Sequence, residues 1–297
     1  MVAKTTEHLH TEARALDARP PLEVASILAD GQVAAATSVH NALSQICAAA
    51  SAMAGAIRNG ARLHYVAAGS SGLMAAADAQ ELGGTFSIPA DQIRIHMAGG
   101  LPTGPDMPGE TEDDISGLAT GLAELTARDV IIAVSASGST PYTVAAVEIA
   151  KTRGATVIAI ANNPDTPLLA FADQPILLQT PPEVLSGSTR MGAGTSQKIA
   201  LNMLSTLMAV DLGHVHDGMM VNLRADNAKL RARAAHMVSD IGQVSLSEAE
   251  GALVRTQDNV KAAILVARGL AADQARQLLD DTGGLLRPVL EKLEQTN

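Results

Sequence analysis

Three short segments rich in serine, threonine and glycine are the parts of this chain best suited to chemistry. They span residues 69–72, 135–140 and 187–198, and each leads into a run with helical periodicity. Hydroxyl groups and free backbone N–H groups at the start of a helix favour an anion such as phosphate. Ordinary turn chemistry is the alternative for any single loop, but the three together predict a phosphosugar site.

Two acidic residues adjoin these loops and could supply acid–base catalysis. Glu81 ends the helical run after the first loop, and Glu112 follows a stretch rich in proline and glycine, residues 101–109. Two carboxylates near a sugar can serve as general acid and general base, and each role contributes about 10²–10⁴-fold in rate. The alternatives are a solvated carboxylate at a helix end for Glu81 and an acid that complements a helix dipole for Glu112.

The elements that must position these groups alternate between strand and helix. Short apolar runs predict five strands, and helical patterns fall between them at 72–81, at 113–126 and from Pro141. This alternation predicts a doubly wound α/β fold with a parallel sheet, whose ligands bind at the carboxyl ends of the strands. All three polar loops follow such ends. The predicted strands are 62–68, 92–97, 129–135, 155–161 and 174–178.

Helical segments flank the predicted sheet on both sides along the chain. An alanine-rich helix is expected before the first strand, and only helices are expected after the last polar loop, one of them capped by Ser245 and Glu248. These helices are 21–60, 199–212, 227–241 and several short ones across 246–293. We therefore expect an N-terminal helical segment (1–60), a central phosphosugar domain (61–240) and a C-terminal helical subdomain (241–297).

Composition excludes several classes of function. A net charge of −10 and an aromatic content of 1% argue against nucleic-acid binding. Cys47 is the only cysteine, so neither an internal disulfide nor a cysteine-based metal site is expected, and His214 and His216 have only Asp217 beside them. No apolar run reaches the roughly 18 residues of a membrane span, and no apolar signal core is present. We expect a cytoplasmic protein without a metal.

A set of motifs extends this interpretation. In order along the chain they are YVAAGSSG, DAQELGGTF, ETEDD, SASGSTPY, PPEVLSGSTRMGAGTSQK and NMLSTLMAVDLG. This set resembles the N-acetylmuramic acid 6-phosphate etherases, which belong to the sugar isomerase (SIS) domain superfamily. The resemblance covers roughly residues 11–240 and, more weakly, the helical tail. The GSTR-x-x-AGT-x-QK and NMLST motifs are specific, whereas GSSG alone is not.

The resemblance implies a cofactor-independent lyase on a SIS-type sheet, acting as a homodimer on a phosphorylated amino sugar from the cell wall. In the family the sugar opens to its aldehyde, a base removes the proton beside the carbonyl, D-lactate leaves from C3, and water adds back. The product is N-acetylglucosamine 6-phosphate. Glu81 falls on the acid that protonates lactate, and Glu112 falls on the base. The implied substrate contacts are Ser70, Ser71, Ser135, Ser137, Ser139, Thr140, Ser188 and Thr189.

The chain also departs from the family pattern. Leu73 and Ser139 replace arginines, Gly192 replaces a lysine, and residues 82–84 replace a Cys-Pro-Pro sequence. Since arginine binds phosphate with two parallel hydrogen bonds, its loss weakens an anion site. Two alternatives therefore stay open. One is a non-catalytic phosphosugar sensor, and the other is an aldose–ketose phosphosugar isomerase, which needs one base and does not need Glu81.

Overall fold

The computed structural model describes residues 5–107 and 109–295 and divides into two compact units. The first unit contains the residues up to Ala79 together with Asp91–Ser205. The second contains Gln80–Ala90 and the residues from Thr206 on. These bounds differ from the predicted segments 1–60, 61–240 and 241–297, which stay a prediction. Pro108, in the predicted proline- and glycine-rich loop, lies outside the described residues.

The first unit is built on a parallel sheet of five strands in the order β2-β1-β3-β4-β5. Every residue of β1 and β3 is buried, which explains why their sequences are mostly apolar rather than alternating between apolar and polar residues. The predicted doubly wound α/β fold is confirmed. The strands are β1 (Leu63–Ala67), β2 (Ile93–Met97), β3 (Val130–Ser135), β4 (Thr156–Ala161) and β5 (Gln174–Leu177).

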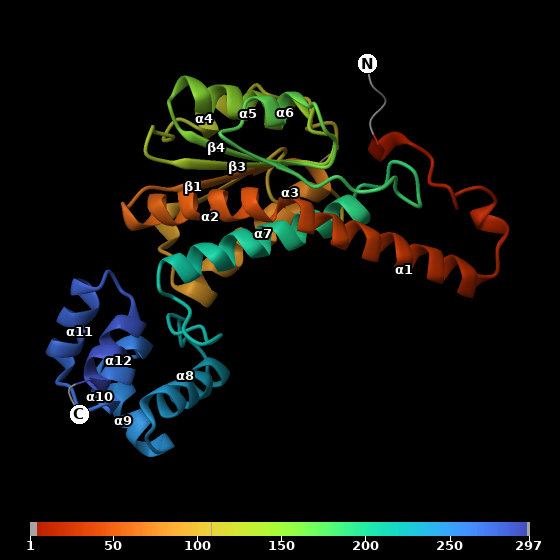
Figure 1. Cartoon of the computed structure of the whole chain (residues 1–297). Helices are drawn as coiled ribbons and strands as arrows, with labels where there is room; N and C mark the ends of the chain where they lie inside the picture. Colours follow the sequence, from red (N-terminus) through yellow and green to blue (C-terminus); the bar gives the residue numbers. More distant parts are fainter. Residues whose placement is uncertain (1–4, 108, 296–297) are drawn as a thin grey trace. The chain divides into compact units, whose positions relative to one another are not determined.

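Helices cover both faces of this sheet (Figure 1). On one face lie α4 (Leu118–Gly121), α5 (Pro141–Thr152) and α6 (Pro167–Ala170), and their core includes Val66, Ile131, Val147 and Leu168. On the other lie α2 (Leu43–Arg58) and the first-unit parts of α3 (Gly69–Phe86) and α7 (Gly192–Asp211). α1 (Pro21–Thr37) precedes α2, and short 3-10 helices span Thr5–Glu7, Leu16–Ala18, Ser38–Ala42 and Ala90–Gln92.

A buried carboxylate ties α3 to its neighbours in the first unit. Asp78 accepts hydrogen bonds from the Tyr65 hydroxyl at 3.0 Å, the Asn202 amide at 2.9 Å and the Ser205 hydroxyl at 2.8 Å. Burial raises the pKa of Asp78, although these three donors oppose the rise. Because the donors come from β1 and α7, this network fixes α3 against both elements.

Two predicted helices are wrong in extent. The predicted helix over 21–60 is interrupted at Ser38–Ala42, where the Ser38 hydroxyl donates to the Ala35 carbonyl at 2.7 Å and competes with the helical ladder. The predicted helix over 113–126 shrinks to α4. There the Ser116 N–H donates to the Asp114 carboxylate at 2.9 Å, a local turn that glycine at 117 favours.

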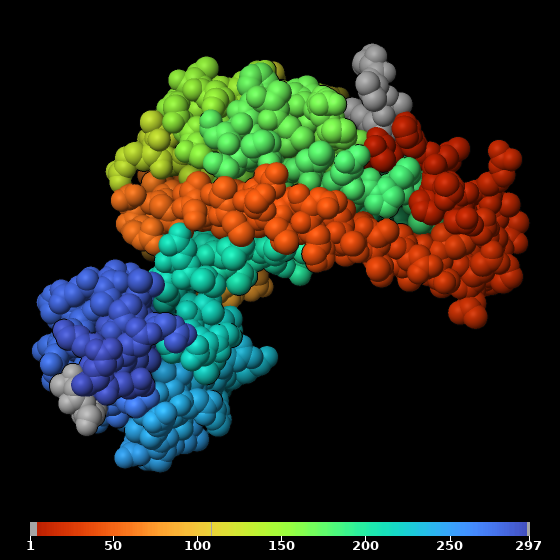
Figure 2. Space-filling view, in the orientation of Figure 1, coloured from red at the N-terminus to blue at the C-terminus, as the bar shows by residue number. Residues whose placement is uncertain are grey.

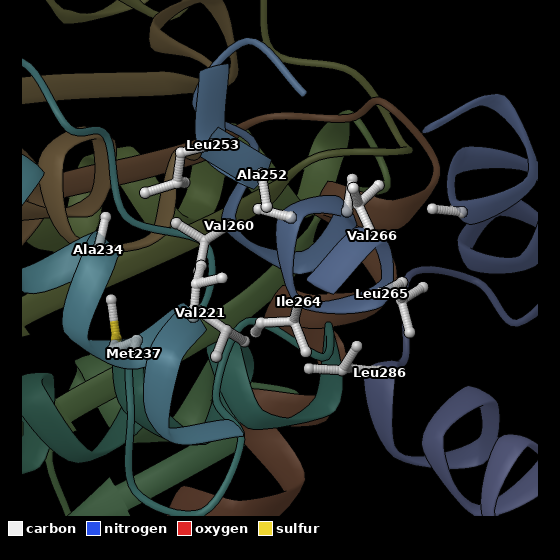
Figure 3. Packing of buried hydrophobic residues seen from close by; sticks show 14 of the residues in the cluster. Val221, Ala234, Met237, Ala252, Leu253, Val260, Ile264, Leu265, Val266 and Leu286 are labelled. Atoms are coloured by element: carbon white, nitrogen blue, oxygen red, sulfur yellow. The ribbon is translucent and has the colours of Figure 1, made fainter. Parts of the chain in front are cut away.

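The second unit is helical and has its own core (Figure 3). Val221, Met237, Leu253, Ile264 and Leu286 pack together there, and the predicted cap of Ser245 and Glu248 is confirmed. The helices are α8 (Ala228–Gly242), α9 (Leu246–Arg255), α10 (Val260–Ala267), α11 (Ala272–Asp281) and α12 (Leu286–Glu294). None of the helices in the described part of the chain combines the length and apolar character needed to span a membrane.

Candidate functional site

The order of the strands reverses between β1 and β3, because β2 lies beyond β1 while β4 and β5 lie beyond β3. At such a reversal in an open α/β sheet, the connections from the two strand ends diverge and leave a crevice that binds ligands. Ser70 and Ser71 follow β1, in a segment that is itself the first turn of α3 rather than a loop. Residues 136–140 follow β3. Two of the predicted polar segments thus leave neighbouring strands at the switch point.

A cluster of hydroxyl groups forms after β3. The Ser135 hydroxyl lies 2.8 Å from that of Thr140 and 3.3 Å from that of Ser137. Backbone N–H groups of Gly138 and Ser139 donate to the Ser135 and Ser137 hydroxyls at 3.1 and 3.2 Å. The Ser139 hydroxyl also donates to that of Ser137 at 3.3 Å, so the structure brings together four of the predicted ligand-binding side chains just before α5. Hydroxyls can turn to donate or accept, so the cluster can reorient toward a phosphate.

Gly138 allows this cluster to form. Its φ of +66° lies in the left-handed region, and a methyl group there would lie 2.4 Å from the Thr166 hydroxyl. Only glycine meets both demands without strain. The turn of the backbone at Gly138 therefore depends on this residue type.

Glu112 lies at the same edge of the sheet, between the starts of α3 and α5. Its Oε1 would be 2.6 Å from a methyl group placed on Gly69, whose φ is +54°. Its backbone carbonyl accepts a hydrogen bond from the Tyr142 N–H at 3.0 Å. The Glu112 side chain is exposed. A carboxylate is thus placed beside the β1–α3 connection, at the edge of the sheet where a ligand is expected.

The third predicted loop is shorter than expected. It ends at Met191, because α7 begins at Gly192 and includes the glycine-rich residues that follow. The first helical N–H groups are not open to a ligand. The Glu183 carboxylate accepts from the N–H groups of Gly192 and Ala193, both at 2.8 Å. Ser188 and Thr189 lie in the turn just before this capped helix start.

The start of α7 is also anchored to the carboxyl end of β4. The side-chain amide of Asn162 donates to the Ser196 hydroxyl at 2.9 Å, and the side-chain amide of Gln197 donates to Oδ1 of Asn162 at 2.8 Å. All three side chains are buried. Sequence reasoning found neither this anchor nor Glu183. For Glu183, a carboxylate nine residues before a glycine-rich helix start was the available signal.

Glu81, the predicted acid, belongs to the second unit. It lies in the last two turns of α3, ten residues after Ser71, and its side chain is exposed. The first unit therefore brings together Glu112, the start of α3 and the hydroxyl cluster, but it does not include Glu81. The catalytic role of Glu81 stays a prediction.

The structure shows the surroundings of two residues that depart from the family pattern, Leu73 and Gly192. Leu73 is 36% exposed near the start of α3. At Gly192 a methyl group would lie 3.0 Å from Oε2 of Glu183 and 3.1 Å from the Ala35 side chain. A longer residue at this position would have to displace the cap or α1.

The second unit contains the two histidines considered for a metal. Nε2 of His216 lies 3.6 Å from the Asp217 carboxylate, which also pairs with Arg287. Within residues 5–107 and 109–295, no group of three histidine, cysteine, aspartate or glutamate side chains is arranged to hold a metal ion.

Comparison with known proteins connects this geometry to a family. A model of the SIS domain matches residues 110–211, which include Glu112, the hydroxyl cluster and all of α7. An N-acetylmuramic acid 6-phosphate etherase of Deinococcus radiodurans is 40% identical over 290 residues, covering 97% of this chain and 95% of that protein. The chain belongs to the N-acetylmuramic acid 6-phosphate etherase family.

Other members of the etherase family show the same extent of similarity. The Streptomyces avermitilis enzyme of this name is 40% identical, with 96% of this chain and 93% of the relative covered. Because these relatives match over nearly their whole length, the chain is an enzyme of the etherase type. A solved structure from Bacteroides fragilis, a candidate phosphosugar isomerase involved in capsule formation, shares the fold at 21% identity. Its TM-score is 0.50, covering 63% of this chain and 88% of that one.

Proposed function

We propose that this chain cleaves the lactyl ether of N-acetylmuramic acid 6-phosphate, giving N-acetylglucosamine 6-phosphate and D-lactate. Membership of the etherase family supports this activity. The observation that carries it is the position of Glu112, whose carboxylate lies beside the β1–α3 connection and whose backbone carbonyl bonds to the first turn of α5. A base and a phosphate-binding cluster then lie at one switch point, as proton abstraction from a phosphosugar requires.

The proposed reaction is an elimination followed by a hydration. Ser70, Ser71 and the hydroxyl cluster bind the 6-phosphate and the opened sugar. Glu112 removes the proton from C2, beside the aldehyde, and the electron pair forms the C2–C3 double bond as the ether oxygen leaves C3. Glu81 protonates that oxygen, so lactate departs with its hydroxyl group. Water then adds to C3 and a proton returns to C2, which balances the reaction.

The proposal includes a homodimer. α1 has 17 residues, of which Ala35 is the only buried one, while Leu22 is 85% exposed and Val33 65% exposed. Figure 2 shows α1 at the surface. A second copy of the chain would remove these apolar side chains from water. The proposed setting is the cytoplasm, because a charged phosphosugar does not cross a lipid bilayer unaided.

The test is release of D-lactate from N-acetylmuramic acid 6-phosphate in deuterated water. The wild-type enzyme should release lactate and incorporate deuterium at C2. Glu112→Gln should lose both by about 10²–10⁴-fold, because the amide cannot take the proton. Glu81→Gln should lose lactate release but keep exchange at C2, because the base is intact.

Two other results would contradict the etherase proposal. Full turnover of a phosphosugar by Glu81→Gln, without lactate release by the wild type, would identify an isomerase. Thermal stabilisation by the phosphosugar without turnover would identify a sensor, the function that the loss of cationic residues at Leu73, Ser139 and Gly192 favours.

A further inference from the structure

We propose that Glu183 is a positioning residue for the substrate: it occupies the start of α7 in place of a ligand anion and thereby holds Ser188 and Thr189 toward the sugar. This inference rests on the proposed function, because it concerns the same site. It also corrects the expectation that the third loop binds phosphate through the start of its helix. Glu183, α1 and the start of α7 all belong to the first unit.

The capping geometry is that of a bound anion. Glu183 is 4% exposed, and its two carboxylate oxygens each accept one hydrogen bond of 2.8 Å from consecutive N–H groups, those of Gly192 and Ala193. These are the first two residues of α7. A charged acceptor shared between two N–H donors at a helix start is a strong arrangement, strengthened by the helix dipole.

Neighbouring elements hold Glu183 in this place. The following residue, Val184, packs so closely on α1 that a methyl group at Gly31 would lie 2.9 Å from its side chain. One turn further along α1, Ala35 closes over Gly192. Between them, Gln32 accepts a hydrogen bond from the Thr195 hydroxyl. One face of α1 thus fixes both the cap and the start of α7.

The cap closes a loop that carries two predicted substrate contacts. Between Glu183 and Gly192 the chain turns back on itself, and the Ser188 N–H donates to the Leu185 carbonyl at 2.9 Å. The Thr189 carbonyl accepts from the Gly194 N–H at 2.8 Å. Because both ends of the loop meet at the cap, the direction of the Ser188 and Thr189 hydroxyls depends on it.

The cap also decides where a ligand anion can bind. A phosphate beside α7 would find its first two N–H donors already bound and a buried negative charge next to them. Within residues 5–107 and 109–295, no side-chain carboxylate caps the start of α5 as Glu183 caps that of α7. The Tyr142 N–H of α5 is bound by a neutral backbone carbonyl, and the Ser135 and Thr140 groups are neutral. Glu183 therefore directs the charged end of the substrate to the other two loops.

Two variants test this role through binding. In Glu183→Gln, one capping contact becomes a clash between two donors. We expect KM to rise about tenfold while kcat changes less than about threefold, since the hydroxyls contribute binding rather than chemistry. The exposed α5 residue Glu148 offers a matched control, and Glu148→Gln should leave KM unchanged.

Glu183→Ala provides the decisive measurement, because it leaves a carboxylate-sized space beside two free donors. Formate should refill that space and restore KM, whereas formate should not lower KM for the wild type or for Glu148→Gln. A wild-type KM in Glu183→Gln, or a raised KM in Glu183→Ala that formate does not lower, would overturn the proposal.

The role of Glu183 can still be tested if the proposed etherase activity is wrong. If the wild type releases no lactate, the dissociation constant for N-acetylglucosamine 6-phosphate, measured by calorimetry, replaces KM, and the same pattern of loss and formate rescue is expected. If Glu183→Ala does not fold, Glu183→Asp shortens the side chain by one methylene and should weaken binding in the same direction. Unchanged binding in Glu183→Asp and Glu183→Gln together would count against the role.

Discussion

The starts of α5 and α7 look alike in sequence and differ in chemistry. Both follow segments rich in serine and glycine on one parallel sheet. At α5 the nearby partners are hydroxyl groups and the backbone carbonyl of Glu112, all neutral. At α7 the partner is the Glu183 carboxylate. The positive end of α5 is therefore available to a ligand anion, whereas that of α7 is already neutralised.

This difference shows that a glycine-rich segment before a helix does not by itself locate an anion site. The internal partner of the first N–H groups decides between a ligand site and a structural cap. In this chain the ligand site at α5 and the structural cap at α7 lie in one unit, and both act on the one proposed substrate. The α5 side is suited to bind its charge, and the α7 side is suited to orient its neutral hydroxyl groups.

Breaking the α5 side should have the largest effect. In Gly138→Ala the new methyl group meets the Thr166 side chain and the backbone keeps a φ of +66°. We expect a loss of about 2–4 kcal/mol in the free energy of unfolding, from overpacking plus left-handed strain. Urea titration measures it. The matched control is Gly60→Ala, where φ is +69° but no atom of the described residues lies within 4 Å of the methyl group.

Gly60→Ala should cost only about 1 kcal/mol, because it carries the strain without the clash. Equal losses in the two variants would mean that the Thr166 contact does not hold the turn. Substrate binding should also fail in Gly138→Ala and persist in Gly60→Ala.

Milder changes should sharpen the contrast between the two helix starts. Thr140→Val removes one hydroxyl of the cluster with little change of shape, and KM should rise about 10–100-fold, as for a hydrogen bond to a charged group. Ser188→Ala, on the α7 side, should raise KM only about 2–10-fold, as for a neutral hydrogen bond. Steady-state kinetics on both variants decides the matter. The reverse order of effects would place the phosphate at the α7 side.

The sheet could be predicted from the sequence because its signal is local. Residues 130–134 form a continuous apolar run, and such a run suits a strand buried on both faces. The helix predicted over 113–126 failed because the Asp114 side chain bonds to the backbone two residues on, which no periodicity reports. The interruption at Ser38 has the same origin.

The site was only partly accessible, because its contacts join residues far apart in the chain. Serine and glycine composition located the hydroxyl cluster. The approach of Glu112 to Gly69 depends on the β2-β1-β3 order of the strands, which places a later segment over an earlier connection. Glu183 was overlooked because it lies nine residues before the helix that it caps. It reaches the helix only because the loop between them is closed, and packing on α1 closes that loop.

The smallest expected effect concerns the pH dependence of stability, which we assign to a pair of histidines in the first unit rather than to the binding loops. Nδ1 of His64 lies 3.0 Å from Nε2 of His96, and the two rings stack with centroids 5.3 Å apart. Burial, then the His96 and arginine charges at residues 62 and 94, lower the pKa of His64 to about 4, against the attraction of Asp129. Burial also lowers the pKa of His96.

In the unfolded chain, histidine titrates near pH 6.5, so below that pH the unfolded state binds protons that folded His64 refuses. The free energy of unfolding should therefore decrease as the pH is lowered, by about 1 kcal/mol per buried histidine between pH 7 and pH 5.5. Thermal melts of His64→Leu should show a flatter pH profile than wild type, and melts of the exposed-residue control His236→Leu should not. The hydroxyl groups of the binding loops do not titrate in this range. If the slope of stability against pH is the same in His64→Leu as in the wild type, groups other than this histidine pair cause the acid sensitivity.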